Sequence, residues 1–171
     1  MTIENIESKF KEITGIQQEV DLSVWPLVQH VGFNIRIEEK QKMGEVFTPL
    51  QLVDRMIEIS KLLPNQFNLD LCAGHGQFTV RILRYFTNNF PDFNLQEYLS
   101  TYHWFNELNP ESVVFLQEIF GHNINIAAGP AEALKSYPQE NTIWKPGIYY
   151  WNSEIKSWKR KIITNTIKPL F

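Results

Sequence analysis

Residues 68–78 of this 171-residue chain read Asn68-Leu69-Asp70-Leu71-Cys72-Ala73-Gly74-His75-Gly76-Gln77-Phe78, and they are its most informative segment. Residues 67–72 are mostly apolar and predict a short buried strand, and Gly74-His75-Gly76 predicts the turn after it. Residues 77–87 predict a helix. Its expected buried side chains are Phe78, Ile82, Leu83 and Phe86. Because glycines let a ligand approach the backbone and a helix start offers free amides, this order predicts a site for an anionic group.

The alternation of helix and strand continues on both sides of this stretch. Thr48-Pro49 predicts the start of a helix before it. The apolar stripe of that helix is expected to hold Leu52, Met56, Ile59 and Leu63. After it, strands are predicted over residues 102–105 and 124–128, and Asn109-Pro110-Glu111 opens a helix between them. The expected inner side chains of that helix are Val113, Val114, Leu116 and Ile119. This alternation predicts an α/β fold with a parallel sheet and flanking helices.

The two ends of the chain are predicted to add to this core. Residues 1–20 carry apolar side chains at three- and four-residue steps, which indicates an amphipathic helix that Gly15 ends. A second short helix is predicted over residues 22–31, and a charged loop over residues 34–43. Near the other end, the pattern around Asn152-Ser153 predicts an antiparallel hairpin. We expect this C-terminal β-hairpin to join the sheet edge or to fold over it.

The predicted hairpin has strands over residues 148–151 and 155–163, with Trp151 opposite Trp158. We therefore divide the single predicted domain, 1–171, into three parts. They are an N-terminal helical segment (1–43), a central core (44–138) and an aromatic, basic hairpin (139–171).

Composition limits the classes of protein. Hydrophobic residues make up 43% and aromatic residues 13% of the chain, which excludes general disorder. No apolar run approaches the roughly 20 residues of a membrane span, and the first residues do not resemble a secretory signal. We therefore expect a cytoplasmic protein with no membrane partner. The single cysteine, Cys72, excludes an internal disulfide, and the four histidines lack metal-ligand spacing, so no metal is proposed.

Charge is distributed unevenly. The formal net charge is −3, but residues 144–171 hold six basic residues and one acid, which leaves −8 for residues 1–143. This basic end permits contact with a polyanion, and it equally suits a solvated edge strand that resists aggregation. Both interpretations stay open. A strongly basic protein that coats DNA is not indicated.

A second site residue is predicted where the next strand ends, in Phe105-Asn106-Glu107. An acid at this place can bind both hydroxyls of a ribose. The alternative is an ordinary surface acid at a helix start. Glu107 lies later than the usual offset of roughly 20 residues, and an insertion over residues 88–101 accounts for the delay.

Two motifs in this order resemble a known family. Gly44-Glu45-Val46-Phe47-Thr48-Pro49, a helix and then the glycine stretch are similar to the adenine-specific N6 DNA methyltransferases, above all the modification subunits of restriction systems. The likeness covers residues 44–132. It implies a Rossmann-like methyltransferase fold that binds S-adenosylmethionine. The residues that it implies for this cofactor are Phe47, Thr48, Pro49, Asp70, Ala73, Gly74, Gly76, Phe78 and Glu107.

The chain also departs from the family. His75 replaces a small polar residue between the glycines, and we interpret it as a solvated loop side chain. Glu132 lies two positions after the place of the acid near the cofactor adenine. The family's Asn-Pro-Pro-Tyr motif, which activates and stacks the target adenine, is absent. Tyr150-Trp151-Asn152-Ser153 lacks both prolines and fits a hairpin better, so no catalytic residue is assigned.

Four functions stay open at this point. The first is a DNA adenine methyltransferase, or a part of one that a second protein subunit completes. The others are a regulatory or anti-restriction binding module, an enzyme that degrades S-adenosylmethionine, and a scaffold without ligand. The missing motif disfavours autonomous methyl transfer, and the retained motifs disfavour a scaffold. We expect a methyltransferase-like protein that binds S-adenosylmethionine, with DNA and a second subunit as the partners to test.

Overall fold

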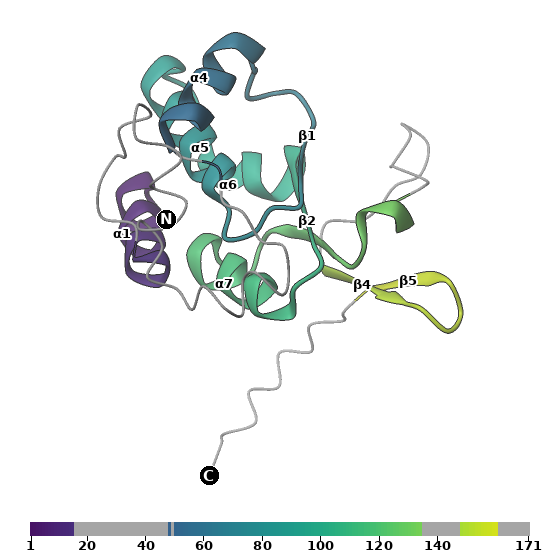
Figure 1. Ribbon diagram of the computed structural model, residues 1–171. Helices are drawn as coiled ribbons and strands as arrows, with labels where there is room; N and C mark the ends of the chain where they lie inside the picture. Colours follow the sequence, from purple (N-terminus) through teal and green to yellow (C-terminus); the bar gives the residue numbers. More distant parts are fainter. Residues whose placement is uncertain (16–47, 49, 135–147, 161–171) are drawn as a thin grey trace.

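The computed structural model describes residues 1–15, 48, 50–134 and 148–160 (Figure 1). The helix predicted over residues 22–31 and the loop predicted over residues 34–43 lie outside these ranges. So do residues 161–163 of the predicted hairpin.

Helices and strands alternate along the described chain. The elements are α1 (Ile3–Thr14), α4 (Leu50–Ser60), β1 (Asn68–Leu71), α5 (Gln77–Asn89), α6 (Leu95–Glu97), the π-helix η2 (Tyr98–Tyr102), β2 (His103–Glu107), α7 (Pro110–Phe120), β3 (Asn125–Ala128), the 3₁₀ helix η3 (Ala131–Ala133), β4 (Ile148–Asn152) and β5 (Ser157–Arg160). The predicted α/β alternation is confirmed. The insertion expected over residues 88–101 contains the end of α5, a turn over residues 90–94, α6 and most of η2.

The five strands form one sheet in the order β1-β2-β3-β4-β5. The first four strands are parallel, and β4 and β5 pair antiparallel with Trp151 opposite Trp158. The hairpin therefore joins the sheet edge through β4, as one of the two predicted arrangements requires. In the register, Asp70 lies beside Phe105 and Glu107 beside Ala128. The carboxyl ends of β1, β2 and β3 consequently meet at one edge of the sheet.

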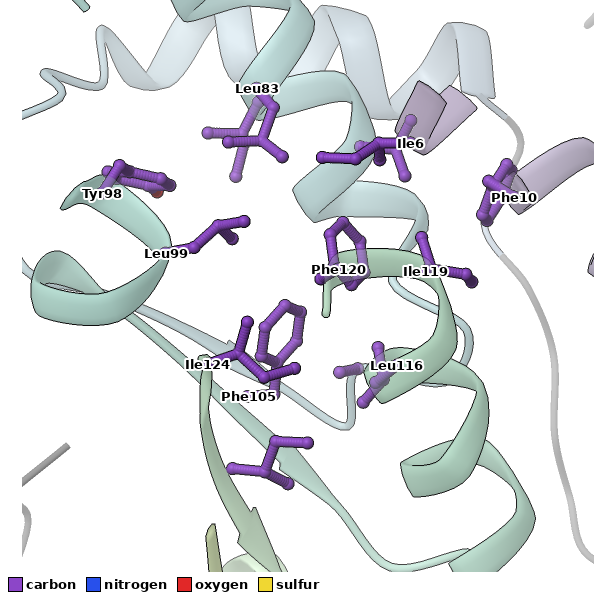
Figure 2. Packing of buried hydrophobic residues seen from close by; sticks show 14 of the residues in the cluster. Ile6, Phe10, Leu83, Tyr98, Leu99, Phe105, Leu116, Ile119, Phe120 and Ile124 are labelled. Atoms are coloured by element: carbon purple, nitrogen blue, oxygen red, sulfur yellow. The ribbon is translucent and has the colours of Figure 1, made fainter. Parts of the chain in front are cut away.

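The main core lies where the helices cover the sheet. All five residues of β2 are buried, which suits a central strand of a parallel sheet. Figure 2 shows Phe105 of β2 beside Phe120 of α7, and their ring centroids are 5.1 Å apart. Leu116 and Ile119 of α7 are buried as predicted, but Val114 is 49% exposed, so its predicted burial is wrong.

Helix α1 packs against both α5 and α7. The Thr2 hydroxyl accepts the amide of Asn5 at its start, and Gly15 ends it with a φ of 68°, as predicted. Arg84 of α5 donates from Nε to Glu7 Oε1 at 2.9 Å. Lys9 Nζ donates to the Glu118 carbonyl at 3.1 Å. These ties hold the N-terminal helix on the body.

Helix α4 does not bury the predicted stripe. Leu52, Met56, Ile59 and Leu63 are all exposed. The buried side chains are instead Val53 and Ile57. Asp54 lies on the same side of the helix and forms a two-pronged ion pair with Arg81 of α5, with Nε to Oδ1 at 2.6 Å. The Asp54–Arg81 ion pair and the buried Val53 and Ile57 explain which face of α4 packs against the body.

None of the helices in the described ranges is long and apolar enough to cross a bilayer.

Candidate functional site

Asn106 joins the ends of the three neighbouring strands. Its buried side-chain amide donates to the carbonyls of Ala127 at 2.8 Å and Gly129 at 2.9 Å. Its own carbonyl accepts the Ala73 amide at 2.9 Å. Sequence reasoning did not single out Asn106. A polar residue inside a buried strand, directly before an acid, was the available signal.

Glu107 lies beside the glycine turn. Its side chain is buried, and Oε2 accepts the Gly74 amide at 2.6 Å while Oε1 accepts the Asn109 amide at 2.7 Å. The alternative of a surface acid is therefore wrong, because these two amides draw the carboxylate inward. A carboxylate has about four lone-pair sites. Both oxygens consequently keep capacity for a further hydroxyl donor.

The turn after β1 contains three left-handed residues. The φ angles are 64° at Cys72, 55° at Gly74 and 83° at Gly76. A Cβ at Gly76 would lie 2.5 Å from Cε2 of Phe120. Gly76 thus permits close packing of the turn on α7, rather than the approach of a ligand to the backbone. Gly74 instead presents its amide to Glu107.

Asp70 ends a chain of four hydrogen-bonded side chains. Asp70 is half-buried, and Thr79 Oγ1 donates to its Oδ2 at 3.0 Å. Thr79 Oγ1 also lies 2.8 Å from His103 Nε2, and His103 Nδ1 lies 3.2 Å from the Tyr98 hydroxyl. Because the one hydroxyl proton of Thr79 points to Asp70, Nε2 of His103 must donate and Nδ1 must accept. The three hydrogen bonds of this network therefore all donate in the direction of Asp70.

Burial sets the protonation states of these four hydrogen-bonded side chains. It raises the pKa of Asp70 to about 6, an effect that the Thr79 bond opposes and the charge of Glu107 adds to. Burial lowers the pKa of His103 to about 3, so the ring is neutral, as the bonding pattern requires. Burial also raises the pKa of the Tyr98 hydroxyl. Among these four hydrogen-bonded side chains, Asp70 is the one that changes charge near neutral pH.

His75 and Cys72 occupy different surroundings within the turn. His75 is buried and lies edge-on to Phe115, with ring centroids 5.0 Å apart. Its interpretation as a solvated side chain is wrong, since the turn directs the ring into the interface with α7. Cys72 is exposed as a residue. Partial desolvation of its thiol, and then the negative charges of Glu107, Asp70 and Glu132, raise its pKa. A neutral thiol is a poor nucleophile.

A cleft of about 240 Å³ lies between α4 and β1. Asp70, Phe78 and His103 line it together with apolar side chains of α4. Ala73, Gly74, Gly76 and Glu107 are not among its lining residues. The structure therefore divides the predicted cofactor residues into a cleft group, Asp70 and Phe78, and an edge group around the glycine turn.

The remaining predicted residues lie at the margins. Thr48 is half-buried, and Phe47 and Pro49 fall outside the described residues. Glu132 is exposed in η3. In the ranges that the structure describes, no cluster of three or more histidine, cysteine, aspartate or glutamate residues could hold a metal ion.

The hairpin packs beside the same edge of the sheet. A Cβ at Gly129 would lie 2.6 Å from Cβ of Trp151, and Trp158 Nε1 donates to the Ala133 carbonyl at 3.2 Å. Asn152 Oδ1 accepts the amides of Glu154 and Ile155 at 3.0 and 3.1 Å. Asn152 is thus a turn residue, which confirms the hairpin interpretation of this segment.

Comparison with known proteins adds no relative. No family model matches the chain, and neither does any curated protein or solved structure.

Proposed function

We propose that this chain binds S-adenosylmethionine at the carboxyl ends of β1 and β2, as a methyltransferase-like protein. The observation that carries the proposal is the position of Glu107, which the Gly74 amide holds at the glycine turn. A buried carboxylate at the end of the second parallel strand suits the two hydroxyls of a ribose. The order of β1, β2 and β3 with helices on the sheet is compatible with one half of a Rossmann-like fold.

The residues present fit the chemistry of this cofactor. Glu107 keeps lone pairs for ribose hydroxyls beside those that accept Gly74 and Asn109. Asp70 adds a second carboxyl group, on the cleft side of β1. S-adenosylmethionine carries a cationic sulfonium and an ammonium group, which favour two nearby carboxylates. When bound, it supplies a methyl group on that sulfonium to an attacking nucleophile.

The strand order favours a second candidate, a binding module without independent catalysis. In a doubly wound sheet the ligand crevice forms where the strand order reverses beside the first strand. Here β4 pairs with β3, and β1 has β2 as its single partner within the described sheet. The described strands therefore form no such reversal. A regulatory module, or a subunit that a second protein completes, would account for this order and for the missing catalytic motif.

Calorimetric titration of the chain with S-adenosylmethionine tests the proposal. We expect saturable heat with one site, and a weaker site in Glu107→Gln. The matched control is Glu111→Gln, which removes an exposed carboxylate from the first turn of α7. Flat heats with the unchanged chain would refute cofactor binding.

A separate assay distinguishes the two candidates. Purified chain is incubated with methyl-labelled S-adenosylmethionine and adenine-containing DNA. Label in DNA supports a methyltransferase, whereas binding without transfer supports the module. Release of methylthioadenosine would instead indicate an enzyme that consumes the cofactor.

A further inference from the structure

The hairpin β4–β5 extends beyond the helical body. Figure 1 shows it projecting from the end of the sheet away from α1 and α4. Trp151 and Trp158 face one side and pack tightly on Gly129. Since side chains alternate along a strand, Tyr150 and its cross-strand partner Lys159 face the other side. The tryptophan face of the hairpin thus packs on the body, and the face with Tyr150 and Lys159 points away from it.

The hairpin is cationic on an acidic body. Lys156, Lys159 and Arg160 are exposed between residues 148 and 160, against one acid, Glu154. Residues 50–134 contain four basic and nine acidic residues. A local cationic surface of this kind attracts a polyanion to the hairpin and away from the rest of the chain.

An aromatic side chain lies among these charges. Tyr150 is 38% exposed and lies directly opposite Lys159. An exposed ring beside lysines is the arrangement that contacts single-stranded nucleic acid, because bases stack on the ring and phosphates meet the cations. A duplex hides its base faces and offers the ring no stacking partner.

We propose that this hairpin face binds single-stranded nucleic acid, with phosphates on Lys156 and Lys159 and a base on Tyr150. The role of the strand as a methylation substrate rests on the proposed function, but the binding itself does not. Strand β4 runs parallel to β3 and ends near Gly129, whose amide bonds the carbonyl of Glu107. A nucleic-acid strand on the hairpin would therefore lie beside the proposed cofactor site.

Fluorescence anisotropy tests the binding with a labelled DNA oligonucleotide of about 20 nucleotides, longer than one hairpin can cover. We expect saturable binding that weakens with salt, with a slope of log affinity against log salt of about −1.4 for two phosphate contacts. The duplex of the same sequence should bind more weakly. Absence of binding at low salt, or tighter binding of the duplex, would overturn the proposal.

Matched variants locate the surface. Lys156→Asn with Lys159→Ala should weaken binding by roughly tenfold or more by removing two phosphate contacts. The control is Lys61→Asn with Lys11→Ala, which removes equal charge elsewhere. Lys61 and Lys156 both have a left-handed φ, of 51° and 49°, so asparagine is matched at both. Equal losses in the two double variants would overturn the assignment to the hairpin.

The ring is tested at one position. Tyr150→Ala should weaken binding by roughly fivefold to a hundredfold, the range for one stacked base. Tyr150→Phe should retain it. Equal weakening by both substitutions would contradict stacking.

Two further measurements separate this proposal from the others. Glu107→Gln should keep nucleic-acid binding and lose affinity for S-adenosylmethionine. Lys159→Ala should keep affinity for S-adenosylmethionine and lose nucleic-acid binding. Polyglutamate serves as a competing polyanion of another class. If it displaces the oligonucleotide at equal charge concentration, the surface is a general anion or acidic-protein site and the nucleic-acid assignment fails.

Discussion

The Glu107 carboxylate and the Gly74 amide are joined by a hydrogen bond of 2.6 Å across 33 residues of sequence. The bond connects the end of β2 to the glycine turn after β1. The same carboxylate accepts Asn109 at the start of α7. The residue proposed to bind the ribose therefore also holds the shape of the turn, and its replacement should affect both stability and binding.

Glu107→Ala should lower the free energy of unfolding by about 1–3 kcal/mol, because two half-buried amides lose their acceptor. Affinity for S-adenosylmethionine should fall by a similar amount, about 1–3 kcal/mol. Urea denaturation and calorimetry measure the two effects. Glu111→Ala, on the exposed side of α7, should stay within about 0.5 kcal/mol in stability. Unchanged affinity in Glu107→Ala would remove this residue from the site.

Much of the fold could be predicted because the signals are local. The glycine turn, the proline at the start of α7 and the paired tryptophans each specify a nearby element. Helix α4 shows the limit, since both Leu52–Met56 and Val53–Ile57 have helical spacing. The Asp54–Arg81 ion pair, which spans 27 residues, accompanies burial of the second pair. A periodicity argument contains no information on such a distant partner.

The sequence predicted the places of Asp70 and Glu107 in the fold better than it predicted the contacts around them. Asp70 and Glu107 both lie at or near the carboxyl edge, as the strand pattern indicated. Asn106 was missed because its role is to join three strands that are distant in sequence. The two glycines also have different roles, because Gly76 packs against Phe120 while the Gly74 amide donates to Glu107.

Asp70 should make stability depend on pH. Its folded pKa of about 6 lies above the value near 4 expected in the unfolded chain, so the folded state binds more protons between these values. Stability from this group is therefore present below about pH 4 and is lost as the pH rises through about 6. Asp70→Asn keeps an acceptor for Thr79 but cannot ionise. The variant should therefore not show the decrease of about 2 kcal/mol in the free energy of unfolding that the unchanged chain shows as the pH rises from 4 to 7.

Urea denaturation of Asp70→Asn and the unchanged chain between pH 4 and 7 measures this difference. The variant should gain relative stability as the pH rises. It should also bind S-adenosylmethionine less tightly, because the carboxylate charge is gone. A stability difference that stays constant over this range would show that Asp70 does not titrate as inferred.

His103 should remain neutral through the physiological range. Its bonds require a proton on Nε2 and a bare Nδ1 that accepts from Tyr98. Nitrogen NMR of the labelled chain should show no imidazolium from pH 5 to 8, since burial lowers the pKa to about 3, and should show the Nε2–H tautomer between pH 7 and 8, where Asp70 is ionised. Tyr98→Phe removes the donor to Nδ1 and serves as the comparison. An imidazolium signal, or a proton on Nδ1, would contradict the direction of the hydrogen-bond chain.

Gly76→Ala should destabilise the chain more than Gly15→Ala does. Both glycines have a left-handed φ, of 83° and 68°, so both substitutions carry the backbone cost of about 1 kcal/mol. At Gly15 the new Cβ meets nothing within 4 Å, whereas at Gly76 it would overlap Phe120 at 2.5 Å. Overpacking should add about 1–3 kcal/mol to the loss at Gly76. Urea denaturation measures the two losses, and Gly76→Ala with Phe120→Leu should recover part of the larger one. Equal losses in the two single variants would show that the turn does not depend on contact with α7.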